Sequence, residues 1–226
     1  MGTVTRIVLF TETNSVFGDY FLTRLASQED VTLAAVVLRE PGALCDYYLD
    51  EPDPVDLAEK AAHLRVPALR PARVNTQEFV TAVEDLAPDY FIVANYQLRL
   101  GRRLLEVPRC DAINFHPSPL PRYAGLAPFY WMAENHETEA GVSAARMTIG
   151  LDEGPLLAQQ LLSLTGTETA KEIRDLHFIA SWRLFDLVLP TLLDRSYRTW
   201  DQDLSERTYF GRPPVDYAGA AMDSHV

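Results

Sequence analysis

AINFHPSPLPRYAG, residues 112–125, joins a run of apolar residues to a proline-rich polar turn. The apolar part predicts a buried strand, and its prolines predict a stiff turn directly after the strand. Ligands of α/β sheets bind outside the carboxyl ends of the strands. This stretch therefore predicts both an α/β fold and the position of a functional site.

Two polar side chains lie where the apolar run ends, Asn114 and His116. Residues two apart on a strand point to the same face. An amide N–H can hold an oxyanion, and an imidazole titrates near pH 6.5, so the pair suits acyl transfer. Two structural roles remain open from these residues alone: Asn114 as a turn residue bonded to its own backbone, and His116 as a partly buried ring bonded to a carbonyl.

A second turn carries a carboxylate between glycines. Residues 150–155 read Gly-Leu-Asp-Glu-Gly-Pro, which predicts a tight, exposed turn with Asp152 as its functional candidate. We expect the strands at 142–148 and 156–162 to deliver this turn beside His116.

These stretches resemble the formyltransferase family that uses 10-formyltetrahydrofolate. The family includes methionyl-tRNA formyltransferase, glycinamide ribonucleotide transformylase and the sugar N-formyltransferases. Its pattern Asn-x-His-Pro-Ser-Leu-Leu-Pro-x-Tyr-x-Gly is present at 114–125, with Pro119 in place of the first leucine. Its Gly-Val-Thr and Leu-Asp-x-Gly pieces are present as Gly-Val-Ser at 141–143 and Leu-Asp-Glu-Gly at 151–154, and weaker similarity covers 6–211.

The resemblance implies a Rossmann-like α/β fold, a mostly parallel twisted sheet flanked by helices. It also implies 10-formyltetrahydrofolate as co-substrate and a catalytic set of Asn114, His116 and Asp152. In this mechanism an amine attacks the formyl carbon, Asn114 and protonated His116 stabilise the oxyanion, and Asp152 orients and charges the imidazole.

The folate contacts follow from the same resemblance, whereas the acceptor contacts in the acidic loop follow from its own carboxylates and paired tyrosines, which suit an ammonium substrate. The expected acceptor contacts are Arg122 and Tyr123 in the first turn and Tyr47 and Tyr48 in an acidic loop. For that loop, residues 46–53, a solvated connector is the open alternative. The expected folate contacts, of which Leu98 and Leu100 can also be core residues, are Tyr96, Gln97, Leu98, Arg99, Leu100, Ile149, Gly150 and Leu151.

Periodicity predicts alternating strands and helices with a loop at 39–54. The turn at 11–18 lacks the Gly-x-Gly-x-x-Gly motif, so we expect no dinucleotide to be bound through that motif. Strands are expected at 6–10, 33–38, 66–69, 90–94, 112–115, 142–148 and 156–162, and helices at 17–26, 54–64, 76–86, 104–108, 127–135 and 169–193.

Bulk properties set the class of protein. The length of 226 residues suits one large domain. We expect a catalytic domain at 1–200, followed by a short, partly ordered tail at 201–226. The sequence predicts neither a signal peptide nor a membrane span. Cys45 and Cys110 lack the spacing of a disulfide framework or zinc site, so we expect a cytoplasmic protein without metal.

The net charge of −12 disfavours nucleic-acid partners, because phosphate backbones are bound by clustered Lys and Arg. A primary amine on a small molecule is the expected acceptor, with a nucleotide-linked amino sugar first. The alternatives are an amino acid or natural-product amine, glycinamide ribonucleotide, hydroxymethyl transfer, or an inactive folate- or nucleotide-binding module. A homodimer is possible.

Overall fold

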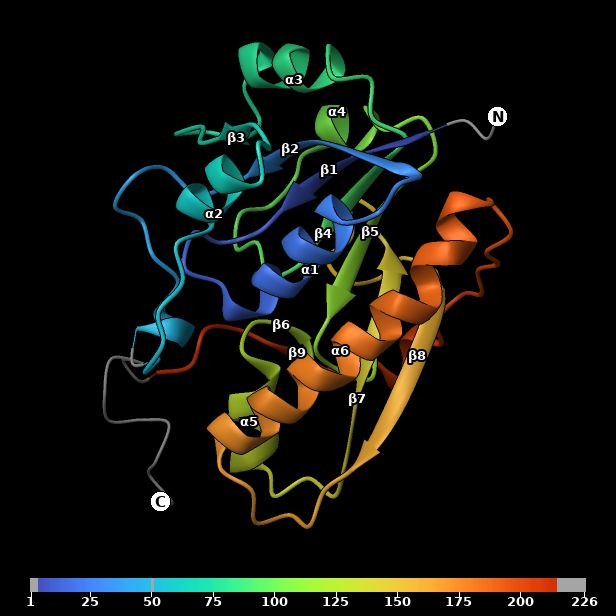
Figure 1. The fold of residues 1–226 in the computed structure, drawn as a ribbon. Helices are drawn as coiled ribbons and strands as arrows, with labels where there is room; N and C mark the ends of the chain where they lie inside the picture. The colour runs from blue at the N-terminus through green and yellow to red at the C-terminus, as the bar shows by residue number, and fades with distance from the viewer. Residues whose placement is uncertain (1–3, 50, 215–226) are drawn as a thin grey trace. The chain divides into compact units, whose positions relative to one another are not determined.

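The computed structural model describes residues 4–49 and 51–214, which form an α/β protein (Figure 1). The chain divides into two compact units, Met1–Asn114 and Phe115–Val226. The strands are β1 (Thr5–Phe10), β2 (Val31–Val37), β3 (Ala68–Leu69), β4 (Tyr90–Val93), β5 (Asp111–His116), β6 (Ala124–Gly125), β7 (Glu139–Arg146), β8 (Leu156–Ser163) and β9 (Tyr209–Phe210). The helices are α1 (Val16–Ala26), α2 (Leu57–His63), α3 (Gln77–Glu84), α4 (Arg102–Leu105), α5 (Pro128–Glu134) and α6 (Ala170–Leu193), with short 3-10 helices at Asp46–Tyr48 and Leu204–Glu206.

The first unit is a parallel sheet in the order β3-β2-β1-β4-β5. Ile7, Val8, Leu9 and Phe10 of β1 are all fully buried. Continuous apolar strands of this kind belong to parallel sheets whose two faces are both covered. This strand order confirms the Rossmann-like prediction.

Side-chain caps set where the helices of this unit begin. The Ser15 hydroxyl accepts a hydrogen bond from the Gly18 amide at the start of α1. Helix α2 begins at Leu57 rather than in the expected region from residue 54, because the Asp56 carboxylate accepts the amides of Ala58 and Glu59. Such caps satisfy the amides that a helix start leaves unbonded.

In the second unit β7 and β8 form an antiparallel pair. In sheet order β7 follows β5 and β8 comes last, which gives β3-β2-β1-β4-β5-β7-β8. Helix α6 lies along β7 and β8 and against α5 (Figure 1). The predicted capping box of Thr169 and Glu172 begins this helix. By length and composition α6 is apolar enough to cross a membrane, but half of its most apolar window is buried in the fold, as in a core helix.

A two-stranded parallel sheet, β6 with β9, was not expected from the sequence. Each strand has only two residues, and the partners lie 85 positions apart, so no local pattern marks the pairing. This small sheet brings residues 209–210 against the turn that follows β5.

Several other predicted elements also differ at their ends, among them two strands and one short helix. The strand expected at 142–148 spans Glu139–Arg146, and the strand expected at 66–69 is only Ala68–Leu69. The helix expected at 104–108 is Arg102–Leu105. It ends early because Pro108 disfavours helical geometry at the residue before it.

Candidate active site

The carboxyl end of β5 presents Asn114 and His116 on one face of the strand. His116 is 6% exposed, and Asn114 is half-buried. Within residues 4–49 and 51–214, the Asn114 side chain makes no hydrogen bond. Its amide therefore remains able to donate to a ligand.

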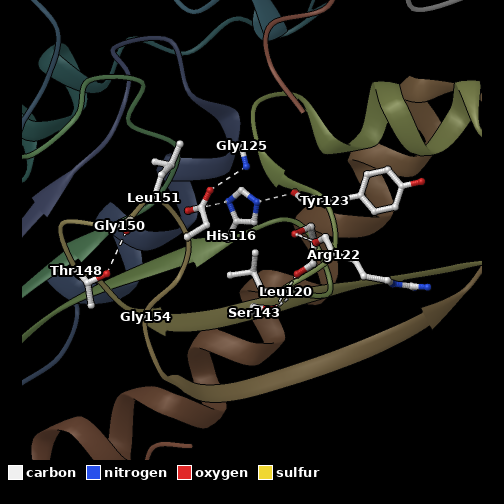
Figure 2. Close-up of polar contacts among 12 residues, drawn as sticks. His116, Leu120, Arg122, Tyr123, Gly125, Ser143, Thr148, Gly150, Leu151 and Gly154 are labelled. Atoms are coloured by element: carbon white, nitrogen blue, oxygen red, sulfur yellow. Dashed lines mark hydrogen bonds and ion pairs between the residues drawn. The ribbon is translucent and has the colours of Figure 1, made fainter. Parts of the chain in front are cut away.

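The two ring nitrogens of His116 face different groups. Nε2 lies 3.1 Å from the carbonyl oxygen of Tyr123. A carbonyl only accepts, so this nitrogen carries the proton of the neutral ring. Nδ1 lies 3.8 Å from Oδ1 of Asp152, beyond hydrogen-bond distance. Nδ1 therefore faces the carboxylate without a hydrogen bond to it (Figure 2).

The second carboxylate oxygen of Asp152, Oδ2, is held by a hydrogen bond from the backbone. The Gly125 amide donates to Oδ2 at 2.9 Å, and the Asp152 side chain is only 8% exposed. Gly125 has φ +103°, and a Cβ there would lie 2.1 Å from the Phe210 carbonyl oxygen, so only glycine fits. As predicted, Asp152 lies beside His116, with 3.8 Å between Oδ1 and Nδ1.

The turn that carries Asp152 has an unusual backbone. Asp152 has φ +55°, the left-handed region, which a residue with a side chain enters only at a cost. At Gly154 a Cβ would lie 1.8 Å from the Arg146 carbonyl oxygen. The glycine recognised in the sequence is thus needed for close backbone packing.

The proline-rich turn after His116 is held by β7 and β8. The Ser143 hydroxyl donates to the Ser118 carbonyl at 2.7 Å and accepts from the Leu120 amide at 3.1 Å. Gln159 donates to the Leu120 carbonyl at 2.7 Å and to Ser143 at 3.0 Å. Sequence reasoning noted the Gly-Val-Ser stretch but missed this role of Ser143, and no sequence signal marks Gln159.

A sequence model of the formyl transferase family, described as "Formyl transferase", matches residues 5–183. The chain belongs to this family. Methionyl-tRNA formyltransferase of Geobacter metallireducens is 39% identical over 110 residues, which is 49% of this chain and 35% of that protein. The chain thus spans about a third of the length of the curated relatives it matches.

Solved formyl transferases share the fold. An N-formyltransferase from Helicobacter canadensis, in complex with folinic acid and dTDP-3-aminofucose, has a TM-score of 0.70 at 19% identity, covering 94% of this chain and 71% of that one. Glycinamide ribonucleotide transformylase 1 from Symbiobacterium toebii has a TM-score of 0.69 at 20% identity, covering 90% and 96%. The α/β fold predicted from the resemblance is therefore that of formyl transferases.

The acceptor contacts predicted in the first turn of this formyl transferase are already engaged by protein groups. Arg122 donates to Glu139 at 2.9 Å. Tyr123 is 3% exposed, its hydroxyl donates to Glu137 at 2.6 Å, and its ring stacks on Phe210 at 4.9 Å. Burial raises the pKa of the Tyr123 phenol to about 12. Any contact of these two side chains with substrate stays a prediction.

The acidic loop is irregular, as expected, apart from the 3-10 helix at Asp46–Tyr48. Tyr48 is 4% exposed, and its hydroxyl accepts from Asn95 at 2.8 Å and from Ser15 at 3.3 Å. Tyr47 is half-buried. Asp50 lies outside the described residues. The packing of Tyr48 explains why its ring is not exposed for stacking on a ligand.

The predicted folate contacts lie in two segments. In the first unit, residues 96–100 form an irregular segment after β4, where the Gln97 amide donates to Glu12 at 2.9 Å and Leu100 is buried. Burial, with the nearby Glu12 charge, raises the pKa of Tyr96. In the second unit, Ile149 and Leu151 are 36% and 42% exposed on either side of Gly150. Exposed apolar side chains beside a catalytic candidate suit a flat ligand.

Two further residues, neither of them among the predicted site residues, contact the Asp152 turn. Gln202 and Arg207 bond to its backbone carbonyls. Both follow the family match, which ends at residue 183.

Proposed function

We propose that this protein transfers the formyl group of 10-formyltetrahydrofolate to a primary amine of a small molecule. Membership of the formyl transferase family supports the reaction class. One observation carries the proposal. At the end of β5, Nδ1 of His116 lies 3.8 Å from a carboxylate oxygen of Asp152, whose second oxygen is held by the Gly125 amide.

The proposed reaction begins when the neutral amine of the acceptor attacks the formyl carbon. A bond forms from the amine nitrogen to that carbon, and the carbonyl oxygen becomes an oxyanion. The bond from carbon to N10 of the folate then breaks, and the amine proton passes to N10. The products are the N-formyl acceptor and tetrahydrofolate.

Asn114 stabilises the oxyanion in this proposal. Its side-chain amide has no partner within the described chain, so donating to the oxyanion breaks no hydrogen bond between residues of the protein. Preorganised donors of this kind commonly supply a factor of about 100 or more in rate.

His116 and Asp152 handle the proton. Doubly protonated His116 donates from Nε2 to the Tyr123 carbonyl and directs Nδ1–H toward Asp152. Both ring nitrogens therefore face oxygen atoms, so each N–H of the protonated ring would point at an acceptor. The distance of 3.8 Å is too long for a hydrogen bond, so Nδ1–H would break no bond to Asp152 when it donates to a reacting atom in the transition state.

The donor is 10-formyltetrahydrofolate, as the resemblance implied. In the second unit, exposed Ile149 and Leu151 would contact its ring system. A sugar 3-N-formyltransferase with a TM-score of 0.71 was solved in the presence of dTDP and 5-N-formyl-tetrahydrofolate. That pairing supports a folate donor on this fold.

For the acceptor we propose a nucleotide-linked amino sugar. The relative solved with dTDP-3-aminofucose supports this class. A phosphate often binds at the helix start after the first strand. Here that turn is filled by protein groups, because Asn14 forms paired hydrogen bonds with the Cys45 backbone and Ser15 caps α1. The acceptor phosphate would therefore bind elsewhere.

The test is an assay with 10-formyltetrahydrofolate and a panel of amines that contains dTDP-amino sugars, amino acids and glycinamide ribonucleotide. Tetrahydrofolate release is followed optically, and the N-formyl product is identified by mass spectrometry. We expect release that requires an amine. Release of formate without an amine would indicate a hydrolase, and no turnover with any amine would refute the proposal.

A further inference from the structure

Residues 200–211 contact both sides of the His116–Asp152 pair. At the start of this segment, Trp200 and Leu156 exchange two backbone hydrogen bonds of 2.8 and 3.0 Å. Near its end, β9 pairs with β6, whose Gly125 amide binds Asp152. The segment thus connects the strand after the catalytic turn to the loop after β5.

Gln202 binds the catalytic turn directly. Its Nε2 donates to the carbonyl oxygens of Asp152 at 3.0 Å and of Gly154 at 2.6 Å. These oxygens only accept, which fixes the amide with its nitrogen toward the turn. Because Asp152 adopts a left-handed backbone, the turn needs such external hydrogen bonds to stay in place.

Arg207 holds the same turn one residue earlier. Its Nη2 donates to the Leu151 carbonyl at 3.0 Å and lies 3.6 Å from a carboxylate oxygen of Glu153. Its guanidinium lies over the Tyr209 ring, 5.3 Å from the centroid, which orients the side chain. Together, Gln202 and Arg207 bind the carbonyls of Leu151, Asp152 and Gly154.

The same segment fixes the other side of the pair. Thr208 accepts the Tyr123 amide at its hydroxyl, 2.8 Å away, and the Ala124 amide at its carbonyl, 3.0 Å away. The Tyr123 carbonyl in turn accepts from Nε2 of His116. Hydrogen bonds therefore run from 200–211 to the backbone groups that hold both His116 and Asp152.

We propose that Gln202 and Arg207 are positioning residues that set the distance between Asp152 and His116, so that residues 200–211 belong to the catalytic unit. This inference rests on the proposed formyl transfer. It differs from the sequence expectation of a catalytic domain that ends at residue 200 with a short tail after it.

The test compares Gln202→Met, which keeps side-chain length without a donor, with Arg207→Lys, which keeps charge without the planar fork. Glu206→Gln is the matched control, because Glu206 is exposed in the same segment and its side chain bonds to no described residue. We expect kcat to fall at least 10-fold in Gln202→Met and less in Arg207→Lys, with KM for the amine within twofold of wild type.

Two readouts separate positioning from a loss of fold. Thermal melting should show a folded Gln202→Met variant, so that its lower kcat does not come from unfolded protein. Amide hydrogen exchange of peptides covering 150–154 should become faster in both variants and stay unchanged in Glu206→Gln. Exchange needs no turnover, so it tests positioning even if the proposed reaction fails.

Wild-type kcat in a folded Gln202→Met variant would overturn the inference, and so would wild-type amide exchange at 150–154. If Gln202→Met does not fold, Arg207→Lys decides by the same two measurements. Absence of formyl transfer in the wild type would refute the proposed function alone.

Discussion

At the scale of single residues, the two nitrogens of His116 are held unequally. Nε2 is bonded to the Tyr123 carbonyl at 3.1 Å, whereas Nδ1 faces Asp152 at 3.8 Å. A backbone carbonyl can neither give nor take a proton at neutral pH, but a carboxylate can stabilise the charge that forms on the ring. In the proposed reaction, proton transfer would therefore depend on Nδ1 of His116 and on the charge of Asp152.

Replacing Asp152 with Asn tests that charge. The amide oxygen can still accept from the Gly125 amide, so the turn should keep its geometry. Because the neutral side chain no longer stabilises positive charge that forms on the ring during proton transfer, we expect kcat to fall by a factor of about 100 to 10,000, the range typical of general acid–base groups. Steady-state kinetics and thermal melting of the variant provide the check, and turnover within threefold of wild type would contradict the role.

Asn114→Asp tests the oxyanion donor separately. Asp has nearly the same shape but no N–H group, and its charge repels an oxyanion. We expect a loss of kcat of about 100-fold or more with little change in melting temperature, because the native side chain bonds to no described residue. If Asn114→Asp retained most of its turnover, another group would have to hold the oxyanion.

At the scale of elements, β7 supports the turn after His116 through one hydroxyl. Ser143 is fully buried, and its loss leaves the Leu120 amide without that acceptor and the Ser118 carbonyl without that donor. We expect Ser143→Ala to lower the free energy of unfolding by about 1 to 3 kcal/mol and to reduce kcat as the turn loosens. Urea denaturation measures the first effect, with exposed Ser163 of β8 replaced by Ala as control.

Helix α6 carries a fully buried histidine. His177 Nδ1 donates to the Ile173 carbonyl at 2.6 Å, and burial lowers the pKa of His177 to about 4. The unfolded chain, with an ordinary histidine pKa near 6.5, therefore binds this proton first as the pH falls. Stability from this group is complete above about pH 6.5 and is lost between about pH 6.5 and 4.

The loss should approach about 3 kcal/mol at pH 4, because each pKa unit is worth about 1.4 kcal/mol. His177→Gln keeps an amide donor for the Ile173 carbonyl but does not titrate. We expect this variant to be less stable than wild type at neutral pH but to lose less stability on acidification. Urea unfolding from pH 7.5 to 4 gives the free energy of unfolding of both proteins as a function of pH. If this free energy falls equally in the wild type and in the variant, His177 does not titrate as its burial implies.

The elements also show what the sequence can predict. Asn114, His116 and Asp152 could be proposed as candidates because strand alternation, turn composition and the family motifs are all local signals, and their catalytic roles stay predictions. The Ser143, Gln202 and Arg207 contacts were not predicted, because each joins residues far apart in sequence. The β6–β9 pairing could not be predicted for the same reason, and a strand of two residues is also too short to show a periodic pattern.

At the scale of the whole molecule, charge bears on the class of acceptor. The chain has 32 acidic and 20 Lys or Arg residues, a net charge of −12. Proteins bind nucleic acid mainly by neutralising phosphates with Lys and Arg, and each neutralised phosphate makes affinity fall with salt. A strongly acidic protein should repel a polyanion at low salt, whereas two neighbouring Lys or Arg side chains are enough to bind the diphosphate of a single nucleotide.

We therefore expect tRNA neither to bind nor to compete with a small amine acceptor, although curated methionyl-tRNA formyltransferases match this chain over about half of its length. The measurement is fluorescence anisotropy with labelled methionyl-tRNA at about 50 and 200 mM salt, the range over which phosphate contacts weaken strongly. Formylation of the best amine is followed in parallel with excess tRNA present. Saturable binding that weakens with salt, together with inhibition of amine turnover, would show a tRNA site and reverse the choice of acceptor. Unchanged anisotropy and turnover would agree with a small-molecule acceptor.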